Sequence, residues 1–492
     1  MAVVLGSAFV LLSAAAAVKT TVLPFSDNNG TTVPPGEYKG PIFKLSHDYP
    51  STAAVPAMPW RVAINNGVIT TGNANAYAEA LKQSVGKDMQ VLIQNYPKWD
   101  AAKAGWYNEP WLGAIREPIH GMYVGNIEFD ASLFVQSGLI KPITTYVLTY
   151  YDKTAATTLN KIWGTTAMEP VIKTSTTQFA EGSVIIKASF ITADGSVWPA
   201  MQGALTWPLY ISTNATTNPP NSPKNDYAVT PPVLTNTSFM QFDIIVKDSK
   251  SAPKTGWVFT TLVYDKTLKQ GANGIWDQMV VLGAQWGNDP QAKDPGNATP
   301  ALIENWNNPA APAYGSETLG WGQRMSGPND GAMNNYAFVS GTNPVRQGTK
   351  PDAKYDVKAG AMVYVQNGKN SSCMSCHSSA QWNAKNPKLG MESFLLPLMT
   401  ARPKKPNGCT GDQCNYLNSP PPGSPLWLKW FKNRLGTEPM DAGSVAADFD
   451  MVLTFKSLPA WYAATTGKPH NLLELDLNGK KRNVEYSGQP VK

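Results

Sequence analysis

GWVFTTLVYD, residues 256–265, is a continuous run of β-branched and aromatic residues with the length of one β-strand. Four other runs share its composition: TTYVLTYY (144–151), GSVIIKASFI (182–191), FDIIVKD (242–248) and MVVLGAQW (279–286). Loops rich in Pro and Asn separate these runs, and no helical stretch connects them, as parallel strands would require. The runs therefore predict a mainly antiparallel β region, sandwich-like or jelly-roll-like, over residues 19–320.

Two shorter signals accompany these strands. Asp194-Gly195 lies between two strand-like runs, which predicts a hairpin turn. NANAYAEALKQSV (73–85) has the period of a helix and predicts one short helix. We find no internal repeat.

Histidine and tryptophan side chains in the β region have two interpretations. His47 and His120 could serve a site, or they could form hydrogen bonds in a core or loop. Tryptophan rings could stack on a sugar or aromatic ligand, but β domains more often bury them in the core. The rings in question belong to Trp60, Trp257, Trp276 and Trp286. The sequence does not identify a ligand for this region.

The beginning of the chain has the composition of an export signal. Residues 2–17 are apolar and small and end in four alanines. This predicts a signal peptide over residues 1–18 and a periplasmic or secreted protein, with a buried N-terminal helix as the other interpretation. The run is too short to span a bilayer and no later run does so. We therefore expect no transmembrane span in the mature chain.

Charge is distributed unevenly along the 492 residues. The formal net charge is +6, and residues 341–492 contain 19 Lys and Arg against 11 Asp and Glu. A basic surface attracts an acidic protein partner, although a solvated surface without a partner has the same composition. The excess is too small and too localised to indicate nucleic-acid binding. A chain of this length predicts two or three domains.

The composition changes after residue 315. Four runs have helical character: DAKYDVKAGAMVYVQN (352–367), MESFLLPLM (391–399), SPLWLKWFKNRL (424–435) and VAADFDMVLTFKSL (445–458). We therefore expect a linker over 321–349, a mostly α-helical domain over 350–465 and a tail over 466–492.

Cys373-Met374-Ser375-Cys376-His377 matches the C-x-x-C-H motif of c-type haem attachment. Two thiols three positions apart can each add to one vinyl group of the macrocycle. The adjacent imidazole then supplies an axial nitrogen to the iron. The motif therefore predicts one covalently attached haem c, bound through Cys373 and Cys376, with His377 as a metal ligand.

A zinc site, a redox dithiol and a chance match are each less favoured by the residues around the motif. A structural zinc site needs four ligands, and Cys409 and Cys414 do not form a second close pair. A thioredoxin-like dithiol belongs to a βαβ unit, which the sequence does not predict. A chance match is uncommon in a chain of this length.

The surroundings of the motif resemble class I cytochrome c domains, over about residues 350–465. Gly360 and Tyr364 have the G-x-x-x-Y spacing of that family's first helix, and DFDMVLTFKSLPAWY resembles its terminal helix. The resemblance implies a helical fold in which these two helices cross closely. It also implies that a proline, here Pro387, offers its carbonyl to the proximal imidazole, although a simple turn proline fits equally well.

The same resemblance implies a methionine as sixth iron ligand, from a loop before the terminal helix. Met440, in LGTEPMDAG, occupies that place. An open sixth position is the alternative without a protein ligand. The competing side chains are Met391, Met399, Met451 and His470.

The whole chain resembles large exported bacterial cytochrome c family proteins with a single haem, which have a long β-rich region before one late C-x-x-C-H motif. The resemblance rests on this layout and on TGWVFTTLVYD and SSCMSCHSSAQ, and it implies no particular activity. In an oxidising compartment Cys409 and Cys414 would form a small disulfide loop, with two thiols as the alternative.

We therefore expect an electron-transfer protein more than an enzyme, with His377 and Met440 as axial ligands and no catalytic residue. A peroxidase- or oxygenase-like haem enzyme with an open distal site is the first alternative, in which His120 would act as acid and base. A binding module whose haem senses redox state is the second. The sequence contains no Gly-x-Ser-x-Gly, Walker, Rossmann or His-Glu-x-x-His pattern.

Overall fold

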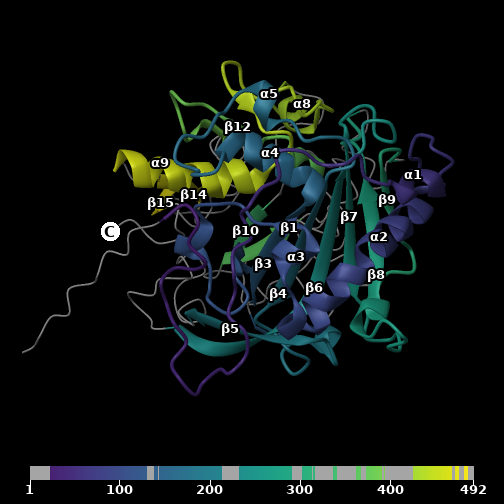
Figure 1. Ribbon diagram of the computed structural model, residues 1–492. Coiled ribbons are helices and arrows are strands. Elements are labelled where there is room, and N and C mark those ends of the chain that lie inside the picture. The colour runs from purple at the N-terminus through teal and green to yellow at the C-terminus, as the bar shows by residue number, and fades with distance from the viewer. Residues whose placement is uncertain are drawn as a thin grey trace, which may run out of the picture.

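A computed structural model of the chain describes residues 23–129, 138–141, 143–212, 232–290, 302–312, 314–315, 336–340, 362–366, 373–390, 393, 425–467, 471–475 and 481–485. Its centre is one antiparallel sheet of nine strands (Figure 1). These strands are β1 (Trp106–Tyr107), β2 (Tyr123–Phe129), β3 (Ile143–Asp152), β4 (Val184–Ile191), β5 (Thr206–Ser212), β6 (Pro232–Lys247), β7 (Trp257–Tyr264), β8 (Met279–Gln285) and β9 (Asn305–Asn307). The order is β1-β3-β4-β6-β7-β8-β9, with β2 paired to β3 and β5 to β6.

Six further strands form three two-stranded antiparallel sheets. They pair β10 (Tyr336–Ser340) with β11 (Met362–Gln366), β12 (Gln381–Trp382) with β13 (Val445–Ala446), and β14 (Asn471–Leu475) with β15 (Lys481–Glu485). The α-helices are α1 (Pro59–Ala63), α2 (Ala74–Gln94), α3 (Ala101–Ala104), α4 (Lys153–Trp163), α5 (Thr174–Thr177), α6 (Cys373–His377), α8 (Pro425–Phe431) and α9 (Leu458–Thr466). Short 3-10 turns are η1 (Tyr96–Lys98), η2 (Leu112–Ile115), η4 (Pro199–Met201) and η6 (Ile275–Gln278), and η10 (Leu453–Ser457) is a π-helix.

The large sheet is buried on both faces, because the side chains of its central strands alternate between two hydrophobic layers. In β7, Val258 and Leu262 belong to one hydrophobic cluster, whereas Trp257 and Phe259 belong to another. All eight residues of β7 are buried. A strand that is apolar on both sides has no polar face, which explains its continuous hydrophobic run.

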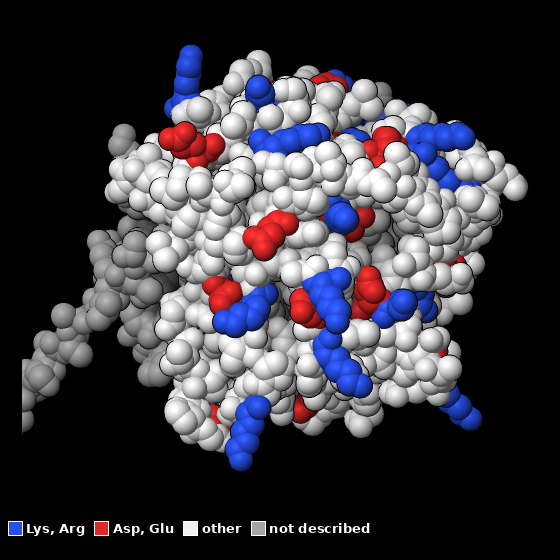
Figure 2. Space-filling model, in the orientation of Figure 1, with Lys and Arg blue, Asp and Glu red and all other residues white. Residues whose placement is uncertain are grey.

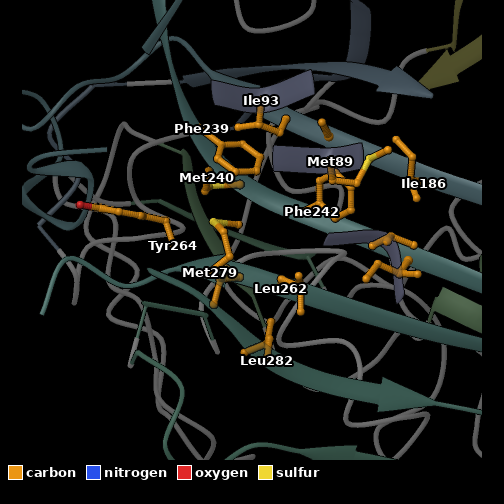
Figure 3. Packing of buried hydrophobic residues seen from close by; sticks show 14 of the residues in the cluster. Met89, Ile93, Ile186, Phe239, Met240, Phe242, Leu262, Tyr264, Met279 and Leu282 are labelled. Atoms are coloured by element: carbon orange, nitrogen blue, oxygen red, sulfur yellow. The ribbon is translucent and has the colours of Figure 1, made fainter. Parts of the chain in front are cut away.

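Helix α2 covers the first face of the sheet. Its buried side chains recur every three or four positions, as an amphipathic helix requires. Figure 3 shows Met89 and Ile93 of this helix beside Phe239, Phe242 and Met279 of the sheet. Each such side chain stabilises the fold by about 1.5–3 kcal/mol when it leaves water. The helix predicted over 73–85 is therefore present, and it continues to Gln94.

The second face carries α4, α6, η10 and α9, and residues of all four belong to the second cluster. Asp152 caps the N-terminus of α4, because its carboxylate accepts the N–H of Ala155 at 2.7 Å; it also accepts that of Val184 at 3.1 Å. In Figure 1 the helices α4, α5, α8 and α9 lie on the side of the sheet away from α1 and α2.

The fold class predicted from the sequence is wrong. The described part of the chain is mostly antiparallel β-sheet with short helices, and it contains no large helical domain of the class I cytochrome c type. The β region is also one large sheet between helices, not a sandwich or jelly roll. Two of the four predicted helices account for most of the error.

The helix predicted over 352–367 is replaced, in its described part, by strand β11, which pairs with β10. The reason is local. The centre of MVYVQ is Val-Tyr-Val, and such β-branched and aromatic residues favour extended backbone. Tyr364 is therefore on a strand, and Gly360 lies outside the described residues.

The helix predicted over 445–458 begins late. Val445 and Ala446 form β13, and a turn follows in which Asp448 and Phe449 have φ values of 45° and 70°. Only then does Asp450 accept the N–H of Leu453 at 3.0 Å, as the first residue of a helix does. Helix α8 confirms the first part of the run predicted over 424–435, and all of 391–399 except Ser393 lies outside the described residues.

Asp194-Gly195 forms a turn but not a hairpin. The Asp194 carboxylate accepts the N–H groups of Ser196 and Val197, at 2.8 and 3.2 Å. The strand before it, β4, pairs with β3 and β6, and the strand after it, β5, pairs with β6.

Within the described residues, no helix is both long and apolar enough to cross a membrane. Residues 1–18 lie outside the described part.

Candidate functional site

The C-x-x-C-H motif forms helix α6 on the second face of the large sheet. Cys373, Cys376 and His377 are spaced i, i+3 and i+4, and all three are partly exposed. Met374 and Ser375, between them, are fully buried at 0% exposure. The helix therefore presents both thiols and the imidazole on one side and packs against the protein with the other. The two cysteines are thiols, not a disulfide.

Contacts with the sheet orient α6. The Met374 side chain belongs to the second hydrophobic cluster, and its N–H donates to Gln285 Oε1 of β8 at 2.8 Å. On the other side, Arg434 donates to Ser378 Oγ at 3.1 Å. Because five residues are too few for a stable isolated helix, these contacts determine where the motif lies.

The His377 ring has a defined orientation. Its Nδ1 lies 2.8 Å from the Phe449 carbonyl oxygen, and its ring centroid lies 4.6 Å from that of Phe259. Burial lowers the pKa of His377 to about 4, so the imidazole is neutral at pH 7. A carbonyl oxygen only accepts, so Nδ1 carries the proton and Nε2 carries the lone pair that binds metals.

A buried ion pair lies close to the motif on the sheet. Lys187 of β4 and Asp243 of β6 are directly paired residues, and their side chains are 2.8 Å apart. Burial raises the pKa of the Cys373 thiol well above its usual value, and the charge of Asp243 raises it further. Cys373 is therefore protonated at neutral pH in the folded chain.

A cavity lies beside the imidazole, between the sheet and the turn that precedes η10. Its volume is about 40 Å³. It is bounded by Thr149, Tyr151, Ile185, Lys187, Ile245, Trp257, His377, Asp448, Phe449, Asp450, Met451 and Val452. Met451, which the sequence left as a competitor for the sixth ligand, thus lines the same cavity as His377.

Two buried carboxyl groups interact near this cavity: Asp450, which lines it, and Glu109. The Tyr151 hydroxyl donates to Asp450 at 2.9 Å, and Trp163 Nε1 donates to Glu109 at 2.7 Å. Burial raises the pKa of Asp450 to about 6. Burial and the charge of Asp450 together raise the pKa of Glu109 well above its usual value. The two groups therefore favour protonation at higher pH than exposed carboxyl groups do.

The structure places Met440 in the loop between α8 and β13, where it is buried. Its neighbour Asp441 donates its N–H to Gln381 Oε1 at 2.9 Å. The Met440 loop is therefore bonded to the chain four residues beyond His377. Pro387 lies in the turn after β12, and the carbonyl bonded to His377 Nδ1 is that of Phe449.

His120 and His47, the histidines of the β region, pack against aromatic rings away from the C-x-x-C-H motif. His120 packs against Trp207, a residue of the first cluster, with ring centroids 4.1 Å apart. His47 stacks on Phe25 at 4.2 Å. The four tryptophans considered as a ligand face, Trp60, Trp257, Trp276 and Trp286, are all buried in the core. Cys409, Cys414, Met391, Met399 and His470 lie outside the described residues.

Sequence reasoning missed the turn Asp448-Phe449-Asp450. Every residue has a backbone carbonyl, so the sequence could not predict that the carbonyl of Phe449 would bind His377. The two aspartates did offer a signal, because two carboxylates beside an aromatic residue are unexpected in a run interpreted as an apolar helix.

No family model, curated protein or solved structure matches this chain. The fit of a cofactor therefore rests on the donor set itself. Two thiols on one helix face, and a neutral imidazole whose second nitrogen binds a backbone carbonyl, are the groups that attach and ligate a haem c. The residues present fit that group.

Proposed function

We propose that this protein is an exported single-haem c-type cytochrome that transfers electrons. The observation that supports this most directly is the arrangement of α6, with Cys373, Cys376 and His377 on one side and the imidazole bonded through Nδ1 to Phe449. When bound, a haem supplies an iron centre that can alternate between the ferric and ferrous states.

The protein's own groups have separate roles in this proposal. The thiols of Cys373 and Cys376 would hold the haem covalently by adding to its vinyl groups. His377 would offer Nε2 to the iron. The Phe449 carbonyl accepts the Nδ1 proton, which fixes the ring orientation and raises the basicity of the ligand. The apolar residues around the motif limit the access of water.

The sixth ligand in this proposal is Met440. Its loop is bonded to the strand that follows the motif, which supports a place near the haem. Met451 is the second candidate, because it lines the cavity beside His377. A methionine thioether in this position raises the reduction potential, which suits an electron carrier.

An acidic protein is the partner in this proposal, because the basic residues are concentrated in the part of the chain that contains the motif. On the face of the molecule that Figure 2 shows, basic and acidic side chains are intermixed. We place the protein in the periplasm or outside the cell, and we retain the resemblance to large exported bacterial cytochromes with one haem as part of the proposal.

Purification from an exporting, haem-attaching host tests this function. We expect the intact mass to include one haem, and the single variants Cys373→Ala and Cys376→Ala to lose one thioether bond each. The ferric wild type should show the weak far-red band of sulfur ligation, and it should be reducible by dithionite. Loss of that band in Met440→Ala but not in Met451→Ala assigns Met440, and the reverse result assigns Met451. A protein that carries no covalent haem contradicts the proposal.

The competing function is a peroxidase- or oxygenase-like enzyme with an open sixth position. The observation in its favour is the cavity beside His377, which contains the buried pair Tyr151 and Asp450. Against it, His120 packs in the other layer of the sheet and is not available as a distal acid. A high-spin ferric spectrum that is unchanged in both methionine variants would favour the enzyme.

A further inference from the structure

Two buried aspartates flank the residue whose carbonyl contacts His377. Asp448 has a side-chain exposure of 0% and accepts three hydrogen-bond donors from distant parts of the chain. Lys247 Nζ donates at 2.7 Å, Trp257 Nε1 at 2.7 Å and the Phe179 N–H at 2.8 Å. These donors belong to β6, to β7 and to the segment before β4, so Asp448 is bonded to the sheet from several directions.

Asp450 makes a second set of bonds one residue beyond Phe449. Tyr151 of β3 donates its hydroxyl to both carboxylate oxygens, at 2.9 and 3.1 Å. The N–H of Leu453 donates at 3.0 Å and begins the following helix. Phe449 therefore lies between two side chains that are each bonded to a different strand.

The backbone of this turn has a conformation that side-chain-bearing residues rarely adopt. Asp448 has a φ of 45° and Phe449 a φ of 70°. An aromatic residue in the left-handed region is unusual, and such a conformation persists only where the surrounding contacts impose it. The direction of the Phe449 carbonyl depends on this backbone conformation. Its oxygen lies 2.8 Å from His377 Nδ1.

We propose that Asp448 and Asp450 are positioning residues that keep Phe449 in its left-handed conformation, and that through its carbonyl they select the Nδ1–H tautomer of His377. Without these bonds the turn relaxes toward negative φ and the carbonyl moves away from the imidazole. The effect on the tautomer is a property of the protein alone. The effect on a haem iron rests on the proposed function, because a weaker acceptor at Nδ1 makes the axial ligand less basic.

The first experiment uses the full chain without haem, purified from a host that lacks the attachment machinery. Nitrogen-15 labelling of the histidines gives the proportions of the two neutral tautomers of His377 by NMR at pH 7. In the wild type we expect the Nδ1–H form to exceed the Nε2–H form by more than about tenfold. In Asp448→Asn, which preserves the side-chain shape but removes the charge, we expect the ratio of the two tautomers to fall by about tenfold or more.

A matched control is available in Asp248→Asn. Asp248 is also fully buried, and like that of Asp448 its carboxylate accepts hydrogen bonds from a cation, an aromatic side chain and a backbone N–H. The donors are the Arg61 guanidinium at 2.8 Å, the Tyr77 hydroxyl at 2.7 Å and the Ser251 N–H at 3.0 Å. Tyr77 belongs to the first cluster, on the other face of the sheet. The control should destabilise the fold to a similar degree and leave the His377 tautomer unchanged. If Asp448→Asn does not fold, Asp450→Asn provides the same test through the Tyr151 bonds.

The second experiment measures the reduction potential of the haem-loaded protein. Asp448→Asn should shift the ferric-ferrous equilibrium toward the ferrous state by about tenfold, equal to about 59 mV for one electron, and Asp248→Asn should not. A wild type that acquires no haem contradicts the proposed function but leaves the NMR test intact. A folded Asp448→Asn protein with wild-type tautomer proportions overturns this inference, whether or not haem is attached.

Discussion

His120 lies between the rings of Tyr96 and Trp207, at centroid distances of 4.3 and 4.1 Å. Its Nδ1 is buried with no hydrogen-bond partner among the described residues. Burial lowers the pKa of His120 from its usual value to about 3. This residue, which the sequence suggested as a possible distal acid, is therefore a neutral core histidine at pH 7.

The depressed pKa of His120 predicts a pH dependence of stability. Between about pH 3 and 6.5 the unfolded chain binds a proton that the folded chain does not, so stability rises with pH in this window. The contribution is up to about 1.4 kcal/mol for each pH unit. His120→Phe preserves the stacking and removes the proton, so its urea midpoint should vary less with pH than that of the wild type. Parallel profiles for the two proteins would contradict the assignment.

The sequence was informative about individual residues where the chemistry depends on side-chain identity and spacing. The spacing of Cys373, Cys376 and His377 identifies the C-x-x-C-H motif, although the sequence did not predict that the three residues form helix α6. It was uninformative where a backbone atom acts, as at Phe449. It also could not predict which distant donors would surround Asp448, because those contacts form only when the strands assemble.

At the scale of the elements, α6 depends on its buried side. Met374 is the apolar residue of this helix that contacts the sheet, and its exposure is 0%. Met374→Ala should lower the free energy of unfolding by about 2–5 kcal/mol, because it removes buried methylene groups and leaves a cavity. Met168→Ala is the control, because Met168 is 46% exposed and should change stability by less than about 0.5 kcal/mol. Chemical denaturation of the full chain measures both, and equal effects would show that α6 does not depend on this contact.

The helices and strands were predictable where the local composition of a segment favours the same structure as its burial does. The five long runs of β-branched residues became strands β3, β4, β6, β7 and β8, because their composition and their burial favour the same state. MVYVQ belongs to a run, 352–367, that the helical spacing of Val357, Ala361 and Tyr364 predicts as a helix, although its own composition favours a strand. The arrangement of the strands in one sheet could not be predicted, because a strand buried on both faces has the same pattern in a sandwich and in a sheet covered by helices.

At the scale of the whole molecule, the second cluster joins residues that are far apart in sequence. It contains Tyr151 and Trp257 of the sheet together with Met374, Phe449 and Leu453. Hydrogen bonds cross the same boundary, from Ser457 to the Pro110 carbonyl at 2.6 Å and from Thr177 to the Ala446 carbonyl at 2.8 Å. The region predicted as a separate haem domain thus completes the covering of the sheet.

This arrangement predicts that the chain does not divide into independent folding units near residue 320. A fragment of residues 23–320 would expose the side of the sheet that Trp257 and Phe259 occupy, and it would leave Lys247 without its carboxylate partner. We expect this fragment to aggregate or to lack dispersed NMR signals, and residues 350–492 alone to be unfolded. The full chain should lose both regions in one transition. Two well-folded fragments with separate melting transitions would contradict this expectation.

The distances along the chain between contacting residues have a consequence for the order of events during maturation. The Tyr151–Asp450 bond joins residues 299 positions apart, and the bond from Ser457 joins residues 347 apart. Contacts of such separation form slowly, because the intervening chain must first be ordered. Once they form, the folded surroundings raise the pKa of the partly exposed Cys373 thiol, which makes it a poorer nucleophile. The newly synthesised chain therefore has an interval in which Cys373 is more reactive than in the folded protein, and the length of that interval sets how fast any enzyme that modifies this thiol must work.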